Sequence, residues 1–277
     1  MSFLQGWQEV KDLRKKIIIP QLGIEDGRIE ENRKKISKAI RENARADLII
    51  FPELVLQGHR LSSSTKEEME EAINLRPEHT LEAMHDYAHR MGAEVIFGEM
   101  DEIRGSVYNL AVYVGRDKMD YYAKTHVHWS EKFKPGRELK IFNTSLGPTG
   151  ILICFDAAFP EAARVLALKG ATTIVVIAAI PVHFDIEYMR IRLRAMAHFN
   201  QVYVLFANRC GEGFSGHSAV IDPKGMIIGA LGKEEGLLEA NIDLAEVEKW
   251  RKKENIYGNR RPELYGALSE EEKEDLY

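Results

Sequence analysis

The sequence of 277 residues contains only two cysteines, Cys154 and Cys210. Two thiols cannot form the disulfide framework of a stapled secreted domain, so that class is excluded. The chain also lacks an apolar run of about 18 residues, and its first residues, 1–16, are mixed and polar rather than a basic segment followed by an apolar one. We therefore expect a cytoplasmic protein that has no contact with a membrane.

A strong excess of one charge is missing as well. The net charge is −5, with acidic and basic residues interspersed, so no basic patch is available to bind nucleic acid. No short repeat, Gly/Ser linker or Pro-rich stretch divides the chain, which is long enough to bury a substantial core. We expect one domain over residues 1–277, including an N-terminal extension over 1–15 and an acidic C-terminal tail over 266–277.

Apolar runs alternate with amphipathic segments, and this pattern predicts an α/β layer fold with a mixed sheet. Strands are expected over residues 16–21, 47–51, 94–98, 173–180 and 202–207. Helices are expected over residues 28–44, 67–75, 81–91, 162–168 and 186–199. Hairpins are expected over residues 106–124 and 218–231, with turns at 115–117 and 222–225. Asp243 and Glu246 resemble a capping box that opens a helix ending at Lys252.

Cys154 lies at a predicted corner between a strand and a helix. It ends the apolar run 151–154, and a turn and a helical segment follow at once. The backbone N–H groups at the start of a helix have no partner inside the helix, so they can bind a developing oxyanion. This setting favours a catalytic nucleophile, although a lone cysteine is more often a small buried apolar residue.

Two further polar residues end apolar segments. Glu53 follows the run 47–52, and Lys124 ends the segment 119–123. Taken singly, Glu53 could cap a following helix and Lys124 could be a solvated lysine. Together with Cys154, the carboxylate and the ammonium predict one active site.

The three groups suffice for acyl transfer through a covalent intermediate. Glu53 accepts the thiol proton of Cys154, and Lys124 with the backbone N–H of Phe155 stabilises the oxyanion. Glu53 then passes the proton to the departing nitrogen and activates the water that hydrolyses the thioester.

The motifs resemble those of the nitrilase, or carbon–nitrogen hydrolase, superfamily. Segment 51–54 with Gly58 matches the glutamate motif of the family, 124–126 its lysine motif, and 154–156 with 159–161 its cysteine motif. The resemblance extends from residue 16 almost to the end of the chain, through Gln21, Asn32 and the segments 207–209, 214–216 with Ser218, 222–225 and 261–265. Motifs in this order and spacing are far more specific than a lone short motif.

This resemblance implies a four-layer α-β-β-α sandwich, with two subunits associating into a homodimer or a larger assembly. It implies neither a cofactor nor a metal. Many members carry a second glutamate after the lysine that positions the substrate and assists the lysine. Glu131 is similar in position, and the alternative is an ordinary loop carboxylate.

The residues after the nucleophile indicate a branch of the family. The triplet Cys154-Phe155-Asp156 is similar to that of members that cleave amide or carbamoyl groups, whereas nitrile-cleaving members read Cys-Trp-Glu. We therefore expect a small amide or N-carbamoyl substrate. A nitrilase or an acyl transferase with the same three residues, or an idle scaffold member, is the alternative. Phe199 departs from the family, which usually has an acid at that position.

Aromatic residues and histidines near the motifs are candidates for the substrate pocket. Trp129, Phe159, His183 and Phe184 could line it, and each could equally belong to the core. A Cys–His pair is the rival catalytic arrangement, with His126, His128, His183, His198 and His217 available. As a metal site, the segment 126–128 lacks a second cluster of ligands.

Overall fold

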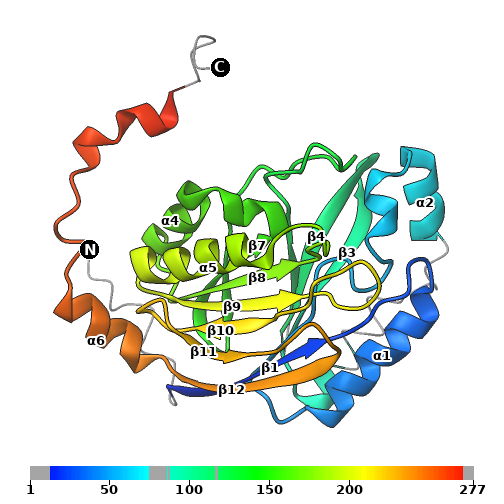
Figure 1. Ribbon diagram of the computed structural model, residues 1–277, viewed down its shortest axis with the longest axis horizontal. Helices are drawn as coiled ribbons and strands as arrows, with labels where there is room; N and C mark the ends of the chain where they lie inside the picture. The colour runs from blue at the N-terminus through cyan, green and yellow to red at the C-terminus, as the bar shows by residue number, and fades with distance from the viewer. Residues whose placement is uncertain (1–12, 75–85, 87, 116–117, 271–277) are drawn as a thin grey trace.

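The computed structural model describes residues 13–74, 86, 88–115 and 118–270. Within them, two six-stranded sheets pack face to face (Figure 1). The first sheet has the order β12 (Gly236–Asp243), β1 (Arg14–Gln21), β2 (Leu48–Ile50), β3 (Val95–Ile103), β4 (Ser106–Val114), β5 (Met119–Ala123). The second has the order β11 (Ile227–Ala230), β10 (Ala219–Ile221), β9 (Tyr203–Asn208), β8 (Thr173–Ala178), β7 (Gly147–Ile153), β6 (Ile141–Thr144).

Helices cover the outer faces of both sheets. Helix α1 (Ile29–Glu42) packs on the first sheet, and α4 (Pro160–Leu168) and α5 (Ile186–Asn200) lie together on the second (Figure 1). Helices α2 (Lys66–Asn74) and α6 (Ala245–Lys253) complete the α-helices that lie wholly within the described residues, and short 3₁₀ turns span 60–63, 154–158, 262–264 and 266–269. The expected four-layer α-β-β-α sandwich is confirmed.

Strand residues alternate between two cores. Ile17 and Ile19 face the second sheet, whereas Ile18 packs beneath α1. On the opposite sheet, Ile151 and Ile153 face inward and Leu152 packs under the outer helices. Because both faces of each central strand are buried, these strands read as continuous apolar runs.

The strands at the centre of each sheet are parallel. In the first sheet β1, β2 and β3 run parallel, and in the second β7, β8 and β9 do so. Side chains that follow such strands gather at one sheet edge. Glu53 comes shortly after β2, and Cys154 directly follows β7.

Several boundaries differ from the expectations. Strand β3 continues to Ile103 and forms an additional hairpin with β4, and the short β6 and the edge strand β12 were not expected. In β12, buried small and apolar residues alternate with exposed ones, which gives a weaker signal than an apolar run. The helix expected over 81–91 lies largely outside the described residues. Among the residues that the structure describes, no helix is both long enough and apolar enough to cross a membrane.

The expected capping box is wrong. Asp243 ends β12, and its carboxylate accepts the N–H of Ala245, while Leu244 is the residue that precedes the helix. Glu246 pairs with Lys249 and Lys224 instead of reaching back to the cap.

Candidate active site

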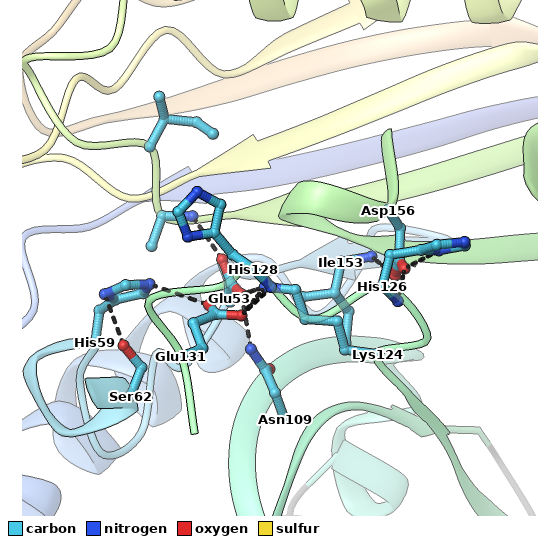
Figure 2. A network of polar contacts seen from close by, with 12 residues as sticks. Glu53, His59, Ser62, Asn109, Lys124, His126, His128, Glu131, Ile153 and Asp156 are labelled. Carbon is cyan, nitrogen blue, oxygen red and sulfur yellow. Dashed lines mark hydrogen bonds and ion pairs between the residues drawn. The ribbon is translucent and has the colours of Figure 1, made fainter. Parts of the chain in front are cut away.

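Glu53 is completely buried between the two sheets. Its Oε1 accepts Asn109 Nδ2 at 2.7 Å and Lys124 Nζ at 3.1 Å, and its Oε2 accepts the N–H of Ala179 at 2.9 Å (Figure 2). Asn109 belongs to β4, and Ala179 follows β8 of the opposite sheet. All these partners are distant in the chain, so the carboxylate does not cap a helix of its own segment.

The turn after Glu53 requires a close approach of two backbones. Leu54 adopts a left-handed φ of 48°, and the chain passes directly over Gly98 of β3. A Cβ at Gly98 would lie 2.4 Å from Leu54 N and 2.6 Å from Glu53 Cα. The glycine therefore allows the carboxylate to reach its place above the sheet.

Lys124 follows β5, and its side chain is 1% exposed. Its Nζ lies between two carboxylates, 3.1 Å from Glu53 Oε1 and 2.9 and 2.8 Å from Glu131 Oε1 and Oε2 (Figure 2). Burial alone would lower the pKa of Lys124, but the carboxylates of Glu53 and Glu131, together with the neighbouring Cys154, outweigh burial and raise that pKa. The lysine is therefore an ammonium at neutral pH.

Glu131, the candidate second glutamate, is also buried. Besides Lys124, its Oε2 accepts the backbone N–H of His128 at 3.1 Å, and its Oε1 lies 3.7 Å from His59 Nε2. Burial raises the pKa of this carboxyl, but the effects of His59 and Lys124 outweigh burial and lower the pKa to about 2. A freely solvated loop carboxylate would show none of these contacts.

Cys154 begins the 3₁₀ turn that follows β7. It adopts a left-handed φ of 46°, which is unusual for a residue with a Cβ and typical of a nucleophile on a sharp corner. Burial and the neighbouring Glu53 raise the pKa of the thiol well above its ordinary value, while Lys124 and the N–H of Ala179 oppose this shift. The resting sulfur is therefore protonated and needs a base when it reacts.

Asp156 connects the cysteine corner to the lysine segment. It is fully buried, and its Oδ2 accepts the N–H of Ile153 and the hydroxyl of Tyr122 at 2.9 and 2.8 Å. Its Oδ1 accepts the hydroxyl of Thr125 at 2.9 Å. The same oxygen accepts the N–H of His126, which lies beside it in Figure 2, at 2.8 Å. One carboxylate thus fixes the residues on either side of the lysine and the nucleophile relative to each other.

The aromatic candidates lie in two groups. Trp129 is 80% exposed and its ring packs 3.7 Å from that of His128, while Phe155 contacts both rings and Phe159. Phe184 lines a separate cavity of about 470 Å³ together with Phe214, whose ring meets His59 at 5.7 Å. His183 is exposed and is not among the described residues that line this cavity.

Three of the candidate histidines form contacts with groups other than the thiol. His126 Nδ1 contacts Asp156, His128 Nδ1 contacts Ser130, and His217 Nδ1 contacts the carbonyl of Ser215. The charges that act most strongly on Cys154 come from Glu53, Lys124 and Glu131. The geometry thus favours the carboxylate and lysine over a Cys–His pair.

The same cluster contains a candidate set of metal ligands. One ligand atom from each of Glu53, His59 and Glu131 lies within 4.8 Å of the others. However, Lys124 Nζ stands 2.8–3.1 Å from both carboxylates, where a metal ion would have to bind. The ammonium already supplies the positive charge, so these residues do not fit a metal.

Sequence reasoning identified the charged residues but missed some of their partners. Asn109, His59 and the N–H of Ala179 were not singled out, and Asp156 was used only as part of the cysteine motif and to choose a branch. A backbone N–H carries no mark in the residue type. The position of Asn109 inside a buried strand was the available signal, because a buried polar side chain needs a partner.

Comparisons with known proteins identify the family of the chain. The family model described as carbon–nitrogen hydrolase matches residues 19–252. A probable nitrilase from Schizosaccharomyces pombe is 32% identical over 257 residues, covering 87% of this chain and 93% of the relative. An N-carbamoylputrescine amidase from Solanum lycopersicum is 30% identical over 252 residues, covering 80% and 84%.

Solved structures show the same fold. The crystal structure of a mutant amidase from Nesterenkonia AN1 matches with a TM-score of 0.79 at 23% identity, covering 92% of this chain and 97% of that one. The NitFhit protein of C. elegans matches with a TM-score of 0.82 at 23% identity, covering 91% and 66%. The motifs, the fold and these relatives agree, and the chain belongs to the carbon–nitrogen hydrolase family within the nitrilase superfamily.

Proposed function

We propose that this enzyme hydrolyses a non-peptide carbon–nitrogen bond in a small amide or N-carbamoyl compound through a thioester on Cys154. The observation that carries the proposal is the buried ammonium of Lys124 between Glu53 and Glu131, with Cys154 in the electrostatic field of all three. Three buried charged groups beside a partly buried thiol are costly to maintain for stability alone.

The first half of the reaction forms the acyl-enzyme. Glu53 accepts the proton of Cys154 while the sulfur attacks the substrate carbonyl, and a carbon–sulfur bond forms. The negative carbonyl oxygen is stabilised by the Lys124 ammonium and the backbone N–H of Phe155. Glu53 then gives its proton to the nitrogen, the carbon–nitrogen bond breaks, and ammonia or an amine leaves.

The second half releases the product. Glu53 removes a proton from water, and the resulting hydroxide attacks the thioester carbonyl. The carbon–sulfur bond breaks, the acid or carbamic acid departs, and the proton on Glu53 returns to the sulfur. Glu131 remains ionised throughout and keeps the lysine charged and directed toward the reacting carbonyl, which its depressed pKa supports.

The proposed substrate class rests on the triplet Cys154-Phe155-Asp156 and on the relatives. One relative is named an N-carbamoylputrescine amidase and another an omega-amidase. A nitrilase activity is the second candidate, because other relatives carry that name. Ammonia release from a panel of simple amides, ω-amides, N-carbamoyl amines, N-carbamoyl acids and nitriles separates the two.

Substitution of the nucleophile tests the proposal directly. Cys154→Ala and Cys154→Ser are expected to abolish turnover and to leave the unfolding temperature nearly unchanged, because either side chain is small enough for the site. Mass spectrometry of the wild-type protein during turnover should show an acyl adduct on Cys154. Wild-type turnover by either variant would refute the thioester route, and an absence of turnover on the whole panel would favour an idle scaffold.

We further propose that two subunits associate through α4 and α5. Their outer faces expose apolar side chains that the described residues of the same chain leave uncovered: Val165, Leu168, Tyr188, Ile191 and Phe199. Phe199→Glu is expected to shift the mass measured by light scattering from dimer to monomer, whereas Met226→Glu on the exposed β11 turn is not.

Two free thiols, one of them the nucleophile, support a location in the reducing cytoplasm.

A further inference from the structure

His59 faces the side of Glu131 that lies away from Lys124 (Figure 2). An ionised carboxylate offers about four lone-pair directions. Lys124 and the N–H of His128 take up the lone-pair directions of Oε2, and Lys124 also takes up one lone-pair direction of Oε1. The remaining direction of Oε1 faces His59 Nε2, which lies 3.7 Å away. The opposite ring nitrogen of His59 lies 3.4 Å from the hydroxyl of Ser62.

The backbone beside His59 is fixed by a half-buried ion pair between Asp26 and Arg209. Asp26 Oδ1 accepts the N–H of Arg60 at 3.2 Å and lies 2.9 Å from Arg209 Nη1. Gly58 permits this approach, because a Cβ there would lie 2.2 Å from Asp26 Oδ1. Arg209 is 2% exposed and comes from the end of β9, in the opposite sheet.

The ring of His59 is held by the same arginine. The ring of Phe214 meets the ring of His59 edge to face, with 5.7 Å between the ring centres. The guanidinium of Arg209 stacks on Phe214, with its central carbon 4.0 Å from the centre of that ring. Arg209 therefore supports both the backbone and the ring of one histidine, through Asp26 and Phe214. A lysine could not combine a bidentate pair with stacking.

We propose that His59 is a positioning residue of this hydrolase, that it acts through Glu131, and that Arg209 and Phe214 hold it in place. The inference rests on the proposed function, because Glu131 matters for turnover only if Lys124 does. A carboxylate restrained on both sides cannot turn its lysine away from the substrate carbonyl. Loss of this restraint lowers kcat more than it raises KM, since the misplacement affects the reacting geometry.

Substitutions at His59 separate this role from simple packing. His59→Leu keeps the size and the contact with Phe214 but removes the polar nitrogen, and we expect kcat to fall about tenfold with KM within about twofold. His59→Gln restores a polar N–H and should recover most of the loss. A purely structural role predicts the reverse, because the apolar residue would pack at least as well as the amide in a half-buried site.

The support from Phe214 is tested by a double substitution. Phe214→Leu alone should lower kcat by a few fold, and the double variant with His59→Leu should be no slower than His59→Leu alone. Arg209→Lys should resemble Phe214→Leu. Fully additive losses, or a His59→Leu enzyme as fast as the wild type, would overturn the inference while leaving the Cys154 reaction intact.

A second measurement does not depend on turnover. His59 is one of the neighbours that lower the pKa of Glu131, so thermal stability should fall less steeply between pH 4.5 and 2 in His59→Leu than in the wild type. Apart from residue 59, both proteins have the same titratable groups around Glu131. These groups are Lys124, His128 and Cys154, and Glu53, which contacts the other side of Lys124. Identical acid profiles would count against the inference even if no substrate were found.

Discussion

The carboxylate of Asp156 accepts the backbone N–H of Ile153, the residue immediately before the nucleophile, at 2.9 Å. The same side chain binds the segment that follows Lys124. The strained corner at Cys154 is thus held from the lysine side of the site, and the two motifs depend on each other for their geometry.

Replacing Asp156 with Asn should destabilise the corner. The amide would direct two N–H donors toward groups that themselves donate, so we expect a loss of about 2–4 kcal/mol in unfolding free energy and a fall of about 100-fold in kcat. Urea unfolding and steady-state kinetics measure both. Glu161→Gln, at an exposed position in the first turn of α4, is the matched control and should change little.

Replacing Glu53 with Gln should separate turnover from thiol reactivity. The carboxylate is the proposed base, so turnover is lost. The same negative charge raises the pKa of Cys154, so the variant thiol should ionise at lower pH than in the wild type. Iodoacetamide labelling of Cys154, followed as a function of pH, is therefore expected to move toward acid in the inactive variant. A shift toward alkali would contradict the placement of Glu53 beside the thiol.

Glu131 should contribute to stability above mildly acidic pH. Its pKa is about 2 in the folded protein against an ordinary value of 4.5, so its contribution is complete above pH 4.5 and disappears as the pH falls toward 2. The shift corresponds to about 3 kcal/mol. In Glu131→Gln this part of the acid destabilisation should be missing, which thermal unfolding at several pH values would reveal. An unchanged acid profile would mean that Glu131 is not held by Lys124 in solution.

Replacing Gly98 with Ala should displace Glu53. The new methyl group would collide with backbone atoms of Glu53 and Leu54, and backbone cannot move aside as cheaply as a flexible side chain. We expect a loss of more than about 2 kcal/mol and a large fall in kcat. Gly232→Ala is the control, because nothing lies within 4 Å of the methyl group that it would add and its φ is not left-handed. Equal effects of both substitutions would disprove the argument.

The sequence was sufficient to predict the family and the layered architecture. Continuous apolar runs such as 17–19 and 151–153 indicate strands buried on both faces, and polar residues directly after them indicate one functional edge. The proximity of Glu53 and Lys124 follows from that reasoning and agrees with their hydrogen bond in the structure. Glu131, which also bonds Lys124, was indicated by the resemblance to the family and not by an apolar run. Their catalytic roles stay predictions.

The remainder depends on contacts that residue types do not encode. The N–H of Ala179 reaches Glu53 from the other sheet, and Arg209 reaches Asp26 across 183 positions in the chain. The strand β12 pairs with β1 from the far end of the sequence. Such pairings are fixed by the packing of the sheets, so local patterns could not have identified them.

The hydrogen bond from Ala179 to Glu53 spans 126 residues and joins opposite halves of the sandwich. The carboxylate of Glu53 therefore lacks this support until the segment that follows β8 has been synthesised and has docked. Each half alone would hold either Glu53 without its hydrogen bond from Ala179 or Cys154 without the neighbouring carboxylate. The proposed site is therefore a property of the assembled sandwich and of neither half alone.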